Sequence, residues 1–130
     1  MWIFTSTGFV SAVRKYDRPD VITVRSRDRR SLEPLTETAG VEIAVSPFGD
    51  YPYRAFIEPE VFTKWVAEQA DAIDYDNFKN LVGQTRGYEF TDALHNVWVA
   101  MLAVEDSSRE VLKSIAETDR ASQSETRQQP

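Results

Sequence analysis

Residues 73–79, which read IDYDNFK, place two carboxylates, an amide and a lysine close together. Neighbouring carboxylates can act as acid and base in catalysis, or they can bind a divalent ion together. A calcium loop that begins at Asp74 would need an oxygen ligand at Phe78 and a closing glutamate at Thr85, so that motif fails. Asp74 and Asp76 stand two residues apart, a spacing that does not by itself indicate catalysis.

A structural role for this stretch is favoured over a catalytic one. Asp74 is expected to end a linker and cap the following helix, because aspartate accepts hydrogen bonds from first-turn amides. Asp76 suits the positive end of the helix dipole, and the rings of Tyr75 and Phe78 are expected to pack inward. The candidate binding residues in this stretch are Asp74, Tyr75, Asn77 and Lys79.

His95 is the only histidine, and the chain has no cysteine. A metal site would therefore need distant carboxylates, and no HExxH-like spacing is present. His95 stands next to Leu94 and three residues before Trp98, so it is expected at the edge of an apolar helix face, although it stays a candidate binding residue. A hydrolase or nuclease that uses His95 and residues 74–79 with a recruited divalent ion is the least favoured functional hypothesis.

Arginine and tyrosine side chains form a third group of candidate binding residues. Arg25 and Arg27 project from the same face of a predicted strand, and Arg54 stands beside Tyr51 and Tyr53 in the run DYPYR. Guanidinium and aromatic groups on an open sheet can stack on bases and bind phosphates. The competing interpretation is that these arginines pair with nearby acids on a solvated face.

Composition restricts the function classes further. The net charge is -6 and the pI is about 4.8, which opposes broad binding to polyanions. Residues 1–54 have a balance of +1, whereas residues 55–130 have a balance of -7. The lack of cysteine removes disulfides and thiolate chemistry. No GxSxG, Walker A or GxGxxG motif occurs, and no signal peptide or long apolar run is present, so a cytoplasmic protein is expected.

Hydrophobic periodicity predicts strands first and helices afterwards. Alternation and turn residues predict strands at 2–5, 9–16, 21–27, 41–45 and 53–57. A helix that Ser31 caps and Gly40 ends is predicted between the third and fourth strands, with Pro34 in its first turn. Later helices are predicted at 58–73, 76–82, 90–104 and 107–119.

This order of elements predicts an α+β fold, with a mainly antiparallel sheet of about five strands and three to four helices on one of its faces. The β-α-β-β-α stretch also resembles part of a ferredoxin-like unit. Residues 1–119 are expected to form one domain, and residues 120–130, which lack large apolar side chains, a disordered tail.

Five short runs together resemble a family of small uncharacterised proteins of bacteria and their phages. These runs are MWIFTSTGFVSAV, ITVRSR, DYPYR, IDYDNFK and LHNVW, and the likeness covers roughly residues 1–104. Pro34 departs from the pattern, because it falls where such proteins have a helix. The resemblance implies an accessory protein of a bacterium or phage, and it implies no catalytic residues.

The leading functional hypothesis is a non-enzymatic protein-interaction or regulatory module that needs no cofactor and no metal. It rests on the missing catalytic motifs, on the acidic helical half and on the many aromatic side chains that can anchor interfaces. The alternative is a nucleotide or single-stranded nucleic-acid binder that uses the arginine-bearing and aromatic sheet face.

Deletion of residues 121–130 is expected to leave the melting temperature nearly unchanged. No large apolar side chain in this segment can offset the entropy lost on ordering it. Differential scanning calorimetry of the full and shortened chains measures the effect, and a fall of many degrees would mean that the segment packs on the rest of the protein.

Overall fold

The computed structural model of the protein describes residues 1–105 and 108–126. The chain divides into two compact units, Met1–Leu94 and His95–Pro130. The strands are β1 (Trp2–Thr5), β2 (Gly8–Lys15), β3 (Arg18–Ser26), β4 (Ala44–Val45) and β5 (Tyr53–Ile57). The helices are α1 (Arg29–Ala39), α2 (Pro59–Asp71), α3 (Phe78–Arg86), α4 (Tyr88–Met101), the 3-10 helix η1 (Leu102–Val104) and α5 (Arg109–Thr126).

The five strands form one sheet with the order β1-β2-β3-β5-β4, and each neighbouring pair is antiparallel. The predicted α+β class is thereby confirmed. Strand β5 lies between β3 and β4, the two strands that α1 connects, so β3 and β4 run parallel with one strand between them. This is the split β-α-β arrangement of ferredoxin-like folds.

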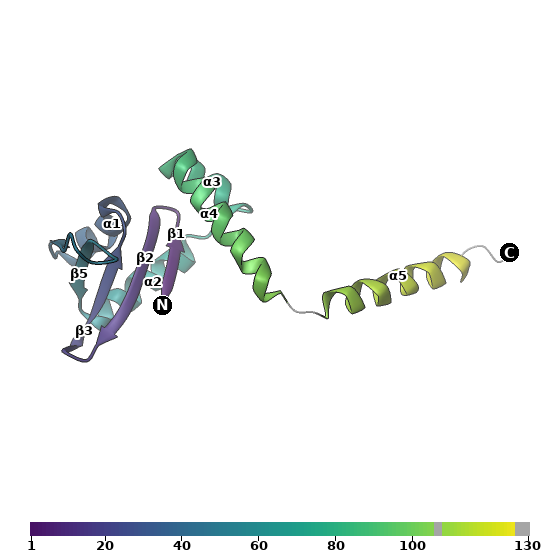
Figure 1. Cartoon of the computed structure of the whole chain (residues 1–130), viewed down its shortest axis with the longest axis horizontal. Helices are drawn as coiled ribbons and strands as arrows, with labels where there is room; N and C mark the ends of the chain where they lie inside the picture. The colour runs from purple at the N-terminus through teal and green to yellow at the C-terminus, as the bar shows by residue number, and fades with distance from the viewer. Residues whose placement is uncertain (106–107, 127–130) are drawn as a thin grey trace. The chain divides into compact units, whose positions relative to one another are not determined.

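Strand alternation separates the side chains of the sheet into two faces. Ala12 pairs with Val24, and Val24 pairs with Ala55, so these three residues share one row across the sheet. Helices α1 and α2 pack on this face, and α2 is seen behind the strands in Figure 1. The buried residues of this core are Val10, Ala12, Val24, Leu32, Leu35, Ala55, Ile57, Phe62 and Trp65.

The helices of the first unit begin and end at recognisable residues. Pro59 occupies the first turn of α2, where its missing amide hydrogen is not needed. Gly40 ends α1 in the left-handed conformation, with φ 65°, as its sequence position predicts. Helix α1 begins earlier than predicted, because Asp28 rather than Ser31 caps it by accepting from the Ser31 amide at 2.9 Å. Pro34 therefore lies in the second turn, inside the helix.

The segment around α3 also differs from its sequence-based expectation. Asp74 is exposed and does not cap the helix; the cap is Asn77, whose side chain accepts from the Asn80 amide at 3.0 Å. Both residue types are good caps, and the one that stands immediately before the helical turn takes the role. Tyr75 and Phe78 are half-buried, and their rings lie 5.8 Å apart.

The predicted strand 41–45 is reduced to Ala44 and Val45, which pair with Arg54 and Tyr53. Val41 and Ile43 still pack against the core, but Val45 is exposed. A short edge strand of this kind offers few free backbone groups for unwanted pairing.

Helix α5 extends into the segment that composition predicts to be disordered. Its backbone is helical to Thr126, and its side chains from Arg109 to Gln123 are exposed. Residues 127–130 of the predicted tail lie outside the described residues. None of the described helices is long and apolar enough to cross a membrane.

Replacement of Asn77 by alanine is expected to lower the free energy of unfolding by about 0.5–2 kcal/mol, the usual cost of a lost helix cap. Asp74→Ala serves as the matched control, since it removes an exposed side chain that caps nothing and should change stability by less than about 0.5 kcal/mol. Urea denaturation measures both variants, and a larger loss for Asp74→Ala would contradict the cap assignment.

Candidate functional site

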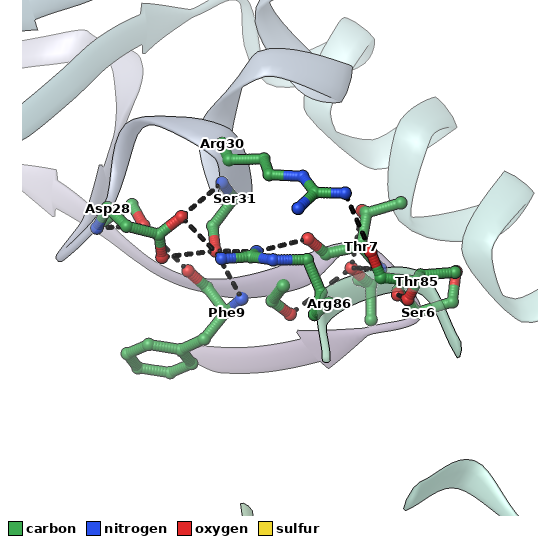
Figure 2. A network of polar contacts seen from close by, with 11 residues as sticks. Ser6, Thr7, Phe9, Asp28, Arg30, Ser31, Thr85 and Arg86 are labelled. Carbon is green, nitrogen blue, oxygen red and sulfur yellow. Dashed lines mark hydrogen bonds and ion pairs between the residues drawn. The ribbon is translucent and has the colours of Figure 1, made fainter. Parts of the chain in front are cut away.

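A buried guanidinium joins three segments that lie far apart in the sequence (Figure 2). The Arg86 side chain is 9% exposed and lies at the end of α3. It donates to the Thr7 carbonyl at 2.6 Å, to Ser31 Oγ at 2.9 Å and to Asp28 Oδ1 at 2.8 Å. It also stacks on the Phe90 ring, with 4.3 Å from its central carbon to the ring centroid. The network therefore links the β1–β2 turn, the start of α1 and the end of α3.

Ser31 is the centre of this network, and every contact of its hydroxyl is structural. Its Oγ donates to Asp28 Oδ2 at 2.7 Å and accepts from the Phe9 amide at 3.1 Å. A serine nucleophile needs a base that takes its proton and a vacant position for substrate. Ser31 is 2% exposed, and its oxygen also accepts from Arg86, so the Asp28–Ser31–Arg86 group holds segments together and does not form a nucleophilic site.

Gly8 makes the close approach of these side chains possible. A Cβ at this position would overlap Ser31 Oγ and lie 2.6 Å from Arg86 Nη1. Its φ of 154° is also outside the range that residues with a Cβ usually adopt. Two further hydrogen bonds lie near the β1–β2 turn. Arg30 donates to the Thr85 carbonyl at 2.7 Å, and Thr85 Oγ1 donates to the Ser6 carbonyl.

The predicted arginine and tyrosine group is partly assembled by the fold. The guanidinium carbons of Arg25 and Arg27 lie 4.6 Å and 4.8 Å from the ring centroid of Tyr51. Arg54 pairs with Arg25 across the sheet and donates to the Tyr51 carbonyl at 3.4 Å. We name this group, Arg25, Arg27, Tyr51 and Arg54, the arginine cluster. Tyr53 does not belong to it, because it follows strand alternation onto the opposite face and packs against the core.

The predicted pairing of these arginines with acids is not found. Arg27 donates to the backbone carbonyl of Asp50 at 2.9 Å, not to its carboxylate, and Arg25 donates to Ser11 Oγ at 3.0 Å. Within the part of the chain that the structure describes, no carboxylate forms an ion pair with a member of the arginine cluster. The arginines of the cluster are held by neutral oxygen acceptors and by the Tyr51 ring.

The other predicted site residues do not form a catalytic arrangement in the first unit. Asp74, Asp76 and Asn77 are exposed, and Lys79 is half-buried in the first turn of α3. His95 belongs to the second unit, where its ring stacks on Trp98 at a centroid distance of 5.8 Å. Among residues 1–105 and 108–126, no three histidine, aspartate or glutamate side chains are grouped so that they could bind a metal ion.

Exposed apolar side chains are the main feature of the second unit. Within its described residues, nine large apolar side chains are between 39% and 72% exposed. They are Val97, Trp98, Val99, Met101, Leu102, Val104, Val111, Leu112 and Ile115. Sequence periodicity marked several of them as a helix face, but it could not show that no described element of the second unit buries that face.

Comparisons with models of protein families, with curated proteins and with solved structures find no match to the chain. The resemblance to small proteins of bacteria and their phages stays a prediction.

Arg86→Met is expected to lower the free energy of unfolding by about 2–4 kcal/mol, because it removes the cation that pairs with Asp28 and the side-chain donor to the Thr7 carbonyl. Arg86→Lys should recover only part of this loss, since an ammonium cannot reproduce the planar fork. Arg30→Ala, which removes one exposed hydrogen bond, is the control and should cost about 0.5–1 kcal/mol. Equal losses for the Arg86 and Arg30 variants in urea denaturation would contradict the central role of Arg86.

Proposed function

We propose that this protein is a non-enzymatic interaction module that binds a partner protein through the apolar side chains of its second unit. The single observation that carries the proposal is the exposure of nine large apolar residues on α4, η1 and α5. Scattered exposed apolar residues are normal on any surface, whereas a concentration of them on successive helical segments is typical of an interaction surface.

The spacing of these residues supports a helical mode of binding. Val97 and Met101 stand four residues apart on α4, and Val104 follows after three in η1. Val111 and Ile115 repeat the four-residue spacing on α5. Residues at these intervals share a helix face, and such faces bind in apolar grooves or against partner helices.

The polar side chains of this unit favour an apolar contact over an electrostatic one. Lys113 pairs with Glu110 at 3.4 Å, and Arg109 pairs with Glu105, so these four charges are matched within the segment. Further charged residues of α5, such as Glu117, Asp119 and Arg120, follow Ile115, so the segment that carries the nine apolar residues offers a partner mainly apolar surface. A regulatory or accessory role for the complex is part of the same proposal.

The double variant Val111→Lys/Ile115→Lys tests this function. Both side chains are exposed, so the melting temperature of the first unit should stay within about 2 °C of wild type. Affinity capture from cells that express the tagged chain should retain a defined protein partner after nuclease treatment and at moderate salt. The variant should lose that partner, because two buried ammonium groups are costly in an apolar interface.

Glu117→Lys is the matched control, since it changes the net charge by the same +2 at an exposed position on the opposite side of α5. It should retain the partner. Equal retention by the double variant and the control, or loss of the partner on nuclease treatment alone, would contradict the proposed function.

A further inference from the structure

The sheet face opposite α1 and α2 carries aromatic and arginine side chains that do not belong to the hydrophobic core. The register places Trp2, Ser11, Arg25 and Arg54 in one row across β1, β2, β3 and β5. Phe4 and Phe9 form a second row, and a third row holds Val13, Thr23 and Phe56. We name this surface the open face.

Aromatic rings on the open face lie at its β1–β2 side. The Trp2 side chain is 68% exposed, and its ring meets the Phe9 ring edge-to-face at 5.7 Å. Phe9 also stacks on Phe4 at 4.7 Å, and both phenylalanines are half-buried. These contacts hold the rings in place while Trp2 leaves much of its surface to solvent.

Guanidinium groups lie on the β3–β5 side of the same face. Besides the arginines of the arginine cluster, this side carries Arg18, whose guanidinium carbon lies 4.1 Å from the Phe56 ring centroid. None of these four arginines forms an ion pair with a described residue. Guanidinium groups that rest on rings present their remaining donors outward in a fixed plane.

Two buried polar atoms on this face lack a hydrogen-bond partner within the described residues. They are Arg25 Nε and Thr23 Oγ1, and Thr23 is 1% exposed. Most buried polar groups in proteins are paired, so an unpaired donor in a cationic group is an unusual feature. Because Arg25 Nε is itself inaccessible, a phosphate can pair with this guanidinium only through its Nη donors.

We propose that the open face binds single-stranded nucleic acid. Rings beside guanidinium groups that form no ion pair with a described residue match a ligand that alternates planar bases with phosphates. Trp2 and Phe9 provide the stacking side, and the arginine cluster provides the phosphate side. Helices α1 and α2 pack on the other face of the antiparallel sheet, and a strand that runs across the open face would be held as in other sheet-based RNA binders.

The width of the open face, from β1 to β5, limits how many nucleotides it can contact. β1 and β5 are three strand spacings apart, which is about 14 Å at the usual separation of neighbouring strands. That distance accommodates about two or three nucleotides, the number that sheet-based RNA binders stack. The net charge of -6 opposes long-range attraction of a polyanion, so binding is expected to be local and weak, in the micromolar range.

Fluorescence anisotropy with a labelled oligothymidylate of about ten nucleotides tests the proposal on the full chain. Wild type should bind at low salt, and its affinity should fall as salt rises. Arg25→Gln/Arg27→Gln should weaken binding at least about tenfold and reduce the salt dependence. The control Arg29→Gln/Lys64→Gln makes the same charge change at exposed positions of α1 and α2 and should bind as wild type does.

Trp2→Ala provides a second variant that does not depend on the arginines. Its side chain is largely exposed, so the fold is retained, and loss of one stacked base should weaken binding about tenfold. Thermal melts of each variant confirm folding before binding is measured.

Four outcomes would overturn the proposal. They are no anisotropy change up to about 100 μM protein, equal weakening by the control pair, duplex binding as tight as that of the single strand, and thymidine monophosphate binding as tight as that of the oligomer. Because the partner-capture experiment uses substitutions on α5, either proposal can fail without the other.

Discussion

The buried guanidinium of Arg86 is the constraint on which the arrangement of the first unit depends. A charged side chain with 9% exposure must find acceptors for its donors, and these come from the β1–β2 turn and from the start of α1. The turn, the helix start and the end of α3 therefore cannot move independently without leaving a charge unpaired. Gly8 is part of the same constraint, because a larger residue would occupy the space of Ser31 and Arg86.

Strand alternation gives the two faces of the sheet different roles, since one face packs against helices and the other carries the proposed binding residues. One face carries the small and branched apolar residues on which α1 and α2 pack. The other carries rings and guanidinium groups that cover Ser11 and Thr23, both of which are 1% exposed although no core lies above them. The arginines donate to carbonyls of the loop before β5, which stabilises that loop, yet their charge remains unmatched by any described carboxylate.

The second unit differs from the first in that its apolar side chains are largely exposed. Its helices have apolar faces but no described element within the unit that removes those faces from water. Burial of such a surface in a complex would be favourable by roughly 25 cal/mol per Å² of apolar area. The two proposed surfaces thus differ in chemistry, one apolar and helical, the other cationic and aromatic.

Much of the fold could be predicted from local patterns. Alternating apolar residues indicated the strands, Pro59 and Gly40 marked a helix start and a helix end, and the β-α-β-β order indicated the split arrangement. The cap residues were harder to predict, because Asp28 and Ser31 are both capable of capping α1, and only the backbone conformation at the helix start selects one of them. The placement of Tyr53 away from Arg54 was predictable, since neighbouring residues of a strand point to opposite faces.

The sequence by itself determined the order of strands and helices, the antiparallel α+β class and the residue types available for binding, because these depend on periodicity and on local backbone preferences. Only the tertiary structure decided which distant residues meet. Arg86 and Asp28 are separated by 58 positions, and no local pattern links them. Likewise, the contacts of Arg25 and Arg27 with the Tyr51 ring depend on the pairing of β3 with β5, which joins segments that are distant in the sequence.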